Sequence, residues 1–118
     1  MSDDYIPTPA DVASVSETAR AAHKLKEASE SAASAVAFSI GKTMSYEPLQ
    51  RAPDSLDGFI VPVNVGYDVF SEEPLAVATR RLLESMFVRR GWRIVKWQDD
   101  DAQAGKGFIH LRPNAGLR

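Results

Sequence analysis

The 118-residue chain contains no cysteine. This absence excludes disulfide bonds, zinc sites built on thiolates and a thiol nucleophile. Histidine is also scarce, because only His23 and His110 are present and neither belongs to an HxxxH or HExxH spacing. Two isolated histidines do not build a catalytic zinc site. We therefore expect no metal and no cysteine-based chemistry.

Long apolar runs are missing as well. The longest, residues 34–40, is far shorter than the roughly 20 residues needed to span a bilayer. The first seven residues are acidic and lack the apolar region of a secretory signal. The sequence also has no GxSxG elbow and no GxGxxG loop. We expect a non-enzymatic protein without a cofactor, made in the cytoplasm and not bound to membranes.

What is present is typical of a globular domain: 44% apolar and 25% charged residues. A chain of this length folds as one domain around one core. Residues 1–8 resemble an extended arm, since prolines stand at positions 7 and 9. Thr8, Pro9 and Asp11 form a capping box, and the alanine-rich sequence after them predicts a helix over residues 9–40. Gly41 is expected to end it.

An apolar stripe runs along this helix with a spacing of about 3.5 residues, as in a coiled coil. Its first part is the candidate interaction surface: Val12, Val15, Ala19, Ala22 and Leu25. A helix over residues 9–40 would be about 45 Å long, whereas a compact domain of this size is roughly 35 Å across. Part of the helix should therefore project, bend back or lie against another chain.

Residues 41–58 carry two prolines and an Asp-Gly pair, which predicts a connector loop. Apolar residues then alternate from Phe59 to Val69, which predicts a strand, and Pro62 favours an edge position or a bulge. A second helix should begin near Pro74 and stop at Gly91. Residues 92–98 and 108–112 predict a terminal hairpin, followed by a tail over residues 114–118. The expected fold is α+β: a long N-terminal helix, then a β-α-β-β unit over residues 59–113 with a small mixed sheet of at least three strands.

Charge is unevenly distributed although the total is only −2. Residues 1–70 carry ten acidic and five basic side chains, and residues 71–118 carry six acidic and nine basic ones. Six basic residues lie between positions 80 and 96, and Trp92 and Trp97 are interleaved with them. Arginine together with exposed aromatic side chains is a combination that binds single strands and phosphates. The candidate nucleic-acid-binding residues are Arg80, Arg89, Arg90, Arg93, Lys96 and Trp97.

Three segments resemble small α+β proteins encoded by tailed bacteriophages. They are the helix opening at Thr8, the segment from Leu82 through Gly91-Trp92-Arg93-Ile94-Val95, and the strand Gly107-Phe108-Ile109-His110-Leu111. The resemblance implies a phage accessory or virion protein, and no functional residue carries over from it.

Our leading hypothesis is a structural or interaction protein, a phage virion or assembly component that docks through its N-terminal arm and helix. Its partners would be other copies of the chain or larger assembly proteins, and it would act in the cytoplasm or in the virion. The first alternative is a module that binds nucleic acid or a phosphate ligand through the basic residues above. The second is an inhibitor of a host protein.

Overall fold

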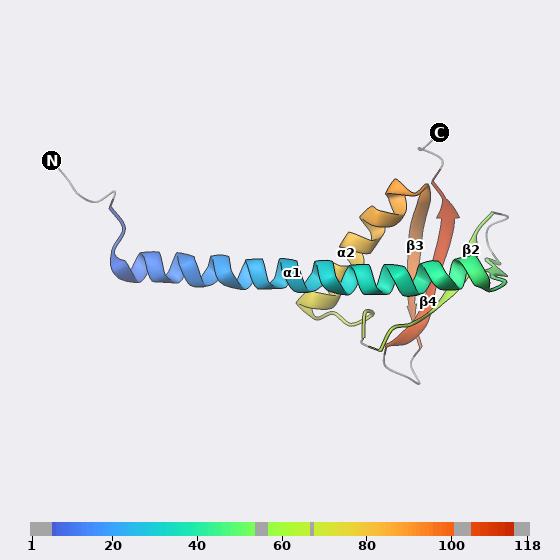
Figure 1. Ribbon diagram of the computed structural model, residues 1–118, viewed down its shortest axis with the longest axis horizontal. Helices are drawn as coiled ribbons and strands as arrows, with labels where there is room; N and C mark the ends of the chain where they lie inside the picture. Colours follow the sequence, from blue (N-terminus) through green and yellow to red (C-terminus); the bar gives the residue numbers. More distant parts are fainter. Residues whose placement is uncertain (1–5, 54–56, 67, 101–104, 115–118) are drawn as a thin grey trace.

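The computed structural model describes residues 6–53, 57–66, 68–100 and 105–114. Within these ranges the chain forms α1 (Pro9–Tyr46), β1 (Gln50–Arg51), β2 (Phe59–Asn64), α2 (Pro74–Arg89), β3 (Trp92–Asp99) and β4 (Lys106–Pro113). The strands make one sheet in the order β1-β2-β4-β3, and both helices pack against the same face of it (Figure 1). The α+β class and the long N-terminal helix are confirmed. Residues 1–5 of the expected arm and 115–118 of the expected tail lie outside the described residues.

The start of α1 has the expected capping box. The backbone N–H of Asp11 donates to Oγ1 of Thr8 at 3.2 Å, and the Thr8 N–H donates to Oδ2 of Asp11 at 3.2 Å. Pro9 occupies the first turn, where its missing N–H costs nothing. The local sequence alone therefore sets the first residue of the helix.

The end of α1 differs from the prediction, because the helix continues through Gly41 to Tyr46. Glycine inside a helix costs about 0.5–1 kcal/mol. Burial on either side of it outweighs this cost, since Ile40 is 1% exposed and Met44 packs against the core. The helix ends where Glu47 turns extended at φ −120° and ψ 143°, the conformation that a following proline imposes.

The expected connector over residues 41–58 is correspondingly shorter, and it contains a strand. β1 pairs antiparallel with the first residues of β2, with Gln50 opposite Ile60 and Arg51 opposite Phe59. β2 ends at Asn64 instead of extending to Val69, and Gly66 follows with φ +78°. Pro62 lies beyond the two residues that β1 covers, so its missing N–H faces an open edge.

The sheet is antiparallel throughout, not mixed. β2 and β3 run in the same direction, as expected for strands joined by a helix, but they are not neighbours. β4 lies between them and pairs antiparallel with both. Because β4 lies between β2 and β3, the parallel pairing that a β-α-β crossover would give is replaced by two antiparallel ladders.

The core forms where the two helices meet the sheet. Its largest fully buried side chains come from α1, α2, β2 and β4, and they include Val36, Ile40, Val61, Leu83, Ile109 and Leu111. α2 ends at Arg89, and Gly91, which was expected to stop it, follows two residues later with φ +86°. The cluster fixes the second half of α1 in place, and this anchoring determines where the first half points.

Gly41 gives a first test of the extended helix. An added Cβ at this position meets no heavy atom within 4 Å. Because alanine favours a helix interior over glycine by about 0.5–1 kcal/mol, we expect Gly41→Ala to raise the free energy of unfolding by about this amount. Urea denaturation followed by circular dichroism measures the change. A destabilised variant would contradict a continuous helix through residue 41.

The same substitution at Gly107 should have the opposite effect. An added Cβ there collides with the backbone oxygen of Gln98 and lies 2.7 Å from Cζ of Phe70. Overpacking of this kind costs about 1–3 kcal/mol, so we expect Gly107→Ala to lower the free energy of unfolding by about 2 kcal/mol in the same assay. Unchanged stability would show that the Phe70 ring does not pack against β4.

Candidate functional site

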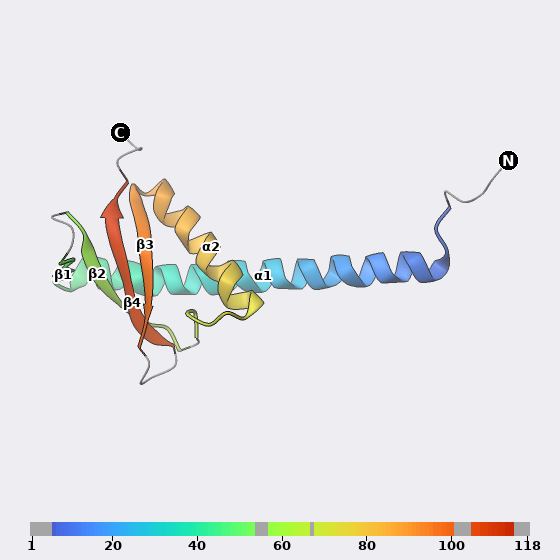
Figure 2. The same ribbon diagram turned by 180° about the vertical axis from the view of Figure 1, so that it is seen from behind.

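The first half of α1 extends well beyond the sheet and α2, as both views of the molecule show (Figures 1 and 2). Residues 9–28, the projecting segment, are exposed to solvent except for the half-buried Ser16. At about 1.5 Å per residue this segment spans about 30 Å. The radius of gyration, 19.4 Å, exceeds the about 13 Å of a compact chain of this length. Of the three outcomes expected for the long helix, projection is the one observed.

A regular row of residues connects the projecting segment to the core. The buried residues of α1 are Ser29, Ala33, Val36 and Ile40, separated by alternating steps of four and three. Continuing these steps toward the N-terminus leads through Lys26 to the predicted interaction residues. We call the whole row the seam: Val12, Val15, Ala19, Ala22, Lys26, Ser29, Ala33, Val36 and Ile40. Leu25, the fifth predicted interaction residue, lies beside the seam rather than in it.

Half of the seam is covered and half is not. Ala33, Val36 and Ile40 are each 1% exposed because α2 and the sheet lie against them, whereas Val12 and Val15 are 50% and 69% exposed. Single exposed apolar residues are ordinary on protein surfaces. Here, however, the exposed residues continue the spacing of a row that is a packing surface elsewhere on the same helix. The projecting segment therefore presents an unpartnered packing surface.

The side chains around the exposed half of the seam favour close approach of another helix. Ser16 and Thr18 stand next to it and are small and uncharged. Glu17 and Lys24 fall on the opposite side of the helix by its periodicity. His23 pairs within the helix with Glu27, with Nε2 2.8 Å from Oε1. Alanine at the centre of the seam also lets two backbones come close, although it buries little area.

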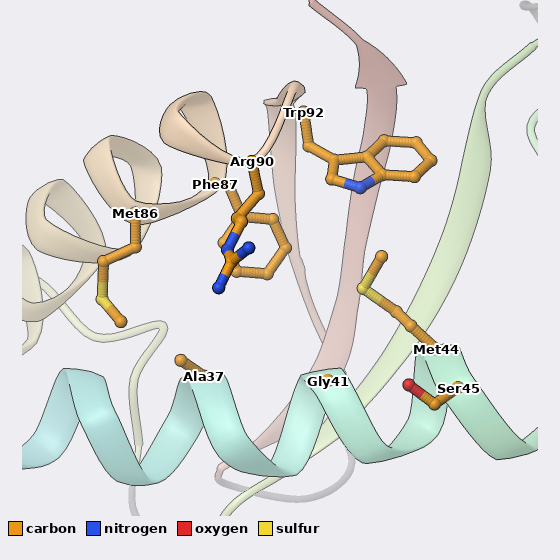
Figure 3. Close-up of a pocket in the computed structure, with 8 residues that line it drawn as sticks. All are labelled: Ala37, Gly41, Met44, Ser45, Met86, Phe87, Arg90 and Trp92. Carbon is orange, nitrogen blue, oxygen red and sulfur yellow. The ribbon is translucent and has the colours of Figure 1, made fainter.

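A second surface feature is an open groove of about 440 Å³ between α1 and α2 (Figure 3). Met44 reaches from α1 toward Trp92, and Met86 and Arg90 descend from α2 toward α1 (Figure 3). Gly41 and Ala37 form the floor on α1, so small residues leave this space open. Arg90 and Ser45 are the polar side chains among its eight lining residues. They do not form a nucleophile with a base.

The six predicted nucleic-acid-binding residues do not form one patch. Arg89 and Arg90 lie at the C-terminal end of α2, and Arg90 borders the groove. Arg93 and Lys96 lie on the face of the sheet away from the helices, where they pair with Arg112 and His110. The basic segment of the sequence is therefore divided among different surfaces.

Trp97 belongs to the core side of the sheet because of a β-bulge. The register of β3 shifts between Ile94 and Lys96, which reverses the alternation of side chains after Val95. Trp97 consequently packs edge-on against Phe70 with ring centroids 6.0 Å apart, and its Nε1 donates to Oε1 of Glu84 at 3.0 Å. Without the bulge, strict alternation would have placed it on the outside.

Arg80 holds two parts of the fold together and is not an exposed binding residue. Its guanidinium donates from Nη1 to the carbonyl oxygens of Val69 at 2.8 Å and Ser71 at 2.6 Å, which ties α2 to the segment that leads into it. Its side chain is only 15% exposed. The sequence gives no sign of these two bonds, because their acceptors are backbone carbonyls in an irregular segment.

No family model, curated protein sequence or solved structure matches the chain. Within the ranges that the structure describes, no group of three histidine, aspartate or glutamate side chains could hold a metal ion. No helix in those ranges has the length and apolar character required to cross a membrane. Of the features described above, the exposed half of the seam is the candidate functional site.

The structural role of Arg80 can be tested by its effect on stability. Hydrogen bonds from a charged donor contribute about 1.5–3 kcal/mol, so Arg80→Ala should lower the free energy of unfolding by about 2 kcal/mol, measured in urea. Arg81→Ala, one position along and exposed, is the matched control and should change it by less than about 0.5 kcal/mol. Equal effects of the two substitutions would contradict the structural role of Arg80.

Proposed function

We propose that the protein is a non-enzymatic interaction protein that self-associates through the exposed half of the seam. The observation that carries this proposal is the continuity of the seam, which is a buried packing surface over Ser29–Ile40 and an exposed one over Val12–Ala22. Repeats with this spacing pack against a second helix in a left-handed supercoil. The partner that we propose is the projecting segment of a second copy.

The folded part of each copy favours an antiparallel pair. A partner helix that follows the seam toward the C-terminus reaches the residues already covered by α2 and the sheet, beginning at Ser29. In a parallel pair both copies would bring this folded part into the same space. A parallel pair in register would also place Lys26 against its own copy, which like charges oppose. An antiparallel pair avoids both conflicts.

The length of the projecting segment then selects the register. The helix begins at Pro9, and this residue can lie no further along the partner than about residue 25 without meeting the partner's folded part. In that alignment Val12 faces the partner's Ala22 and Val15 faces the partner's Ala19. Each valine is thus opposite an alanine, the alternation of large and small residues that fills a core evenly.

The association should be weak and dependent on concentration. Valine and alanine bury little area, and about 17 residues per helix form less than a standard interface of roughly 1,600 Å². Weak symmetric contacts of this kind suit an assembly in which many contacts act together. The resemblance to tailed-phage proteins supports a phage particle, or its assembly, as the setting.

Sedimentation velocity over a concentration series tests the pairing. We expect a monomer at low micromolar concentration and a dimer toward millimolar concentration. Ala19→Glu should abolish the dimer because it places a charge at the centre of the seam, whereas Ala21→Glu adds the same charge on an outer position of the helix and should not. A wild-type chain that remains monomeric throughout, or equal effects of the two variants, would overturn the proposal.

The absence of cysteine allows a direct test of direction. In an oxidised mixture of Val12→Cys and Ala22→Cys chains, the antiparallel register predicts mainly the mixed disulfide between residues 12 and 22. A parallel pair would instead join each variant to itself. Mass spectrometry of the cross-linked dimers separates the two outcomes, and a dominance of like-with-like products would exclude the antiparallel register.

A further inference from the structure

One face of the sheet is left uncovered. Both helices lie on the other side, and the view from behind shows the strands in front of α1 (Figure 2). The pairing register and the bulge place twelve strand side chains on this outer face, all of them exposed or half-buried. They are Gln50, Ile60, Pro62, Asn64, Arg93, Val95, Lys96, Gln98, Lys106, Phe108, His110 and Arg112.

The outer face concentrates positive charge. Arg93 of β3 lies directly opposite Arg112 of β4, and Lys96 lies opposite His110. None of the twelve strand residues of this face is acidic. Like charges directly opposite one another in a sheet are destabilising, so the Arg93–Arg112 pair is an unfavourable arrangement that an anionic ligand would relieve.

The β-bulge at Val95 produces this arrangement. Because the alternation reverses there, Lys96 lies on the outer face with Arg93, and the tryptophans on either side of them lie on the core side. Regular alternation would have sent Lys96 toward the core. The bulge thus gathers the cations of β3 on one surface, and such irregularities are common where a sheet binds a ligand.

Apolar and aromatic groups lie among the cations. The Phe108 ring is 37% exposed and Val95 is 45% exposed. Nε2 of His110 lies 2.9 Å from Oε1 of Gln98, which orients the imidazole on the surface. Ala52 and Pro53 border this area beyond β1, where the surface forms a shallow depression of about 580 Å³ that includes Ile60, Lys96 and Arg112.

We propose that the outer face of the sheet binds single-stranded nucleic acid. Arg93, Arg112 and Lys96 would contact phosphates, and Phe108 would stack on a base. Unpaired bases stack on aromatic side chains that project from a flat surface, while cations follow the backbone. In a duplex the bases are paired and stacked on one another, so Phe108 could stack on a base only at the cost of unstacking it. An acidic peptide would use the cations but not the ring.

Fluorescence anisotropy with a labelled oligo(dT) or oligo(U) of about 20 nucleotides tests the proposal. We expect binding at low salt that weakens steeply as salt rises, with a slope of about −2 in log affinity against log salt for three phosphate contacts. A chain that binds neither oligonucleotide at low salt would overturn it. Equal affinity for a duplex of the same length would also overturn the proposal. The same holds if poly-glutamate of matched charge displaces the oligonucleotide as effectively as unlabelled oligonucleotide does.

Two matched sets of variants locate the site. Arg93→Gln combined with Arg112→Gln should reduce the affinity at least about tenfold and the salt slope by about 1.4. Arg81→Gln combined with Arg89→Gln removes the same charge from the exposed side of α2 and should leave both nearly unchanged. Equal losses in the two double variants would show that net charge, and not the outer face, carries the binding.

The aromatic contact and the folding of the variants are checked separately. Phe108→Ala should reduce affinity about tenfold, and Phe108→Trp should restore it; no effect of Phe108→Ala would contradict stacking.

The Arg93→Gln and Arg112→Gln double variant should melt no lower than the wild type, because it removes a like-charge pair. A lower melting temperature would mean that the two arginines stabilise the sheet, which contradicts their assignment to a ligand.

Discussion

The packing of the second half of α1 against the sheet determines how the rest of the molecule is arranged. Val36 and Ile40 are buried among side chains from α2, β2 and β4, and their removal from water stabilises this attachment. Because α1 is one uninterrupted helix, fixing its second half also fixes the direction of its first half. The projecting segment is therefore a consequence of core packing and needs no contact of its own to hold it out.

The same packing explains why the two proposed surfaces are separate. Both helices occupy one face of the sheet, so the opposite face remains free. The seam and the outer face share no residue. A ligand on one therefore does not compete for side chains with a partner on the other.

The predictable parts of this fold are those that depend on local chemistry. Thr8, Pro9 and Asp11 set the start of α1, and Gly91 with its positive φ sets the end of α2, because caps and stops act within a few residues. The end of α1 differs from the prediction because the low helix propensity of Gly41 does not decide it. Burial of the neighbouring Ile40 and Met44 outweighs that propensity, and the Pro48 signal further along marks the true end.

The register with which strands pair is not predictable from the sequence, even for the two strands of the predicted hairpin. Nothing near β3 shows that its register shifts after Ile94, because the shift is defined only against β4. That one residue decides that Trp97 faces the core and Lys96 the outside, and it thereby divides the basic segment that had seemed continuous. The spacing of the seam, in contrast, depends only on the local sequence of one helix, and Val12, Val15, Ala19 and Ala22 continue the spacing of the buried residues of α1. Their role in an interaction stays a prediction.

The two proposals reinforce one another through geometry. In an antiparallel pair the folded parts lie at opposite ends of the shared helices, so a dimer carries two outer faces far apart. A strand long enough to reach both gains from the second contact without any stronger binding at either. Linkage makes the effect reciprocal, so that a long strand favours the dimer by as much as dimerisation favours strand binding. Two weak contacts of the proposed kind, on an alanine-rich helix and on an open sheet, would then be sufficient for a stable complex on long nucleic acid and for ready dissociation elsewhere.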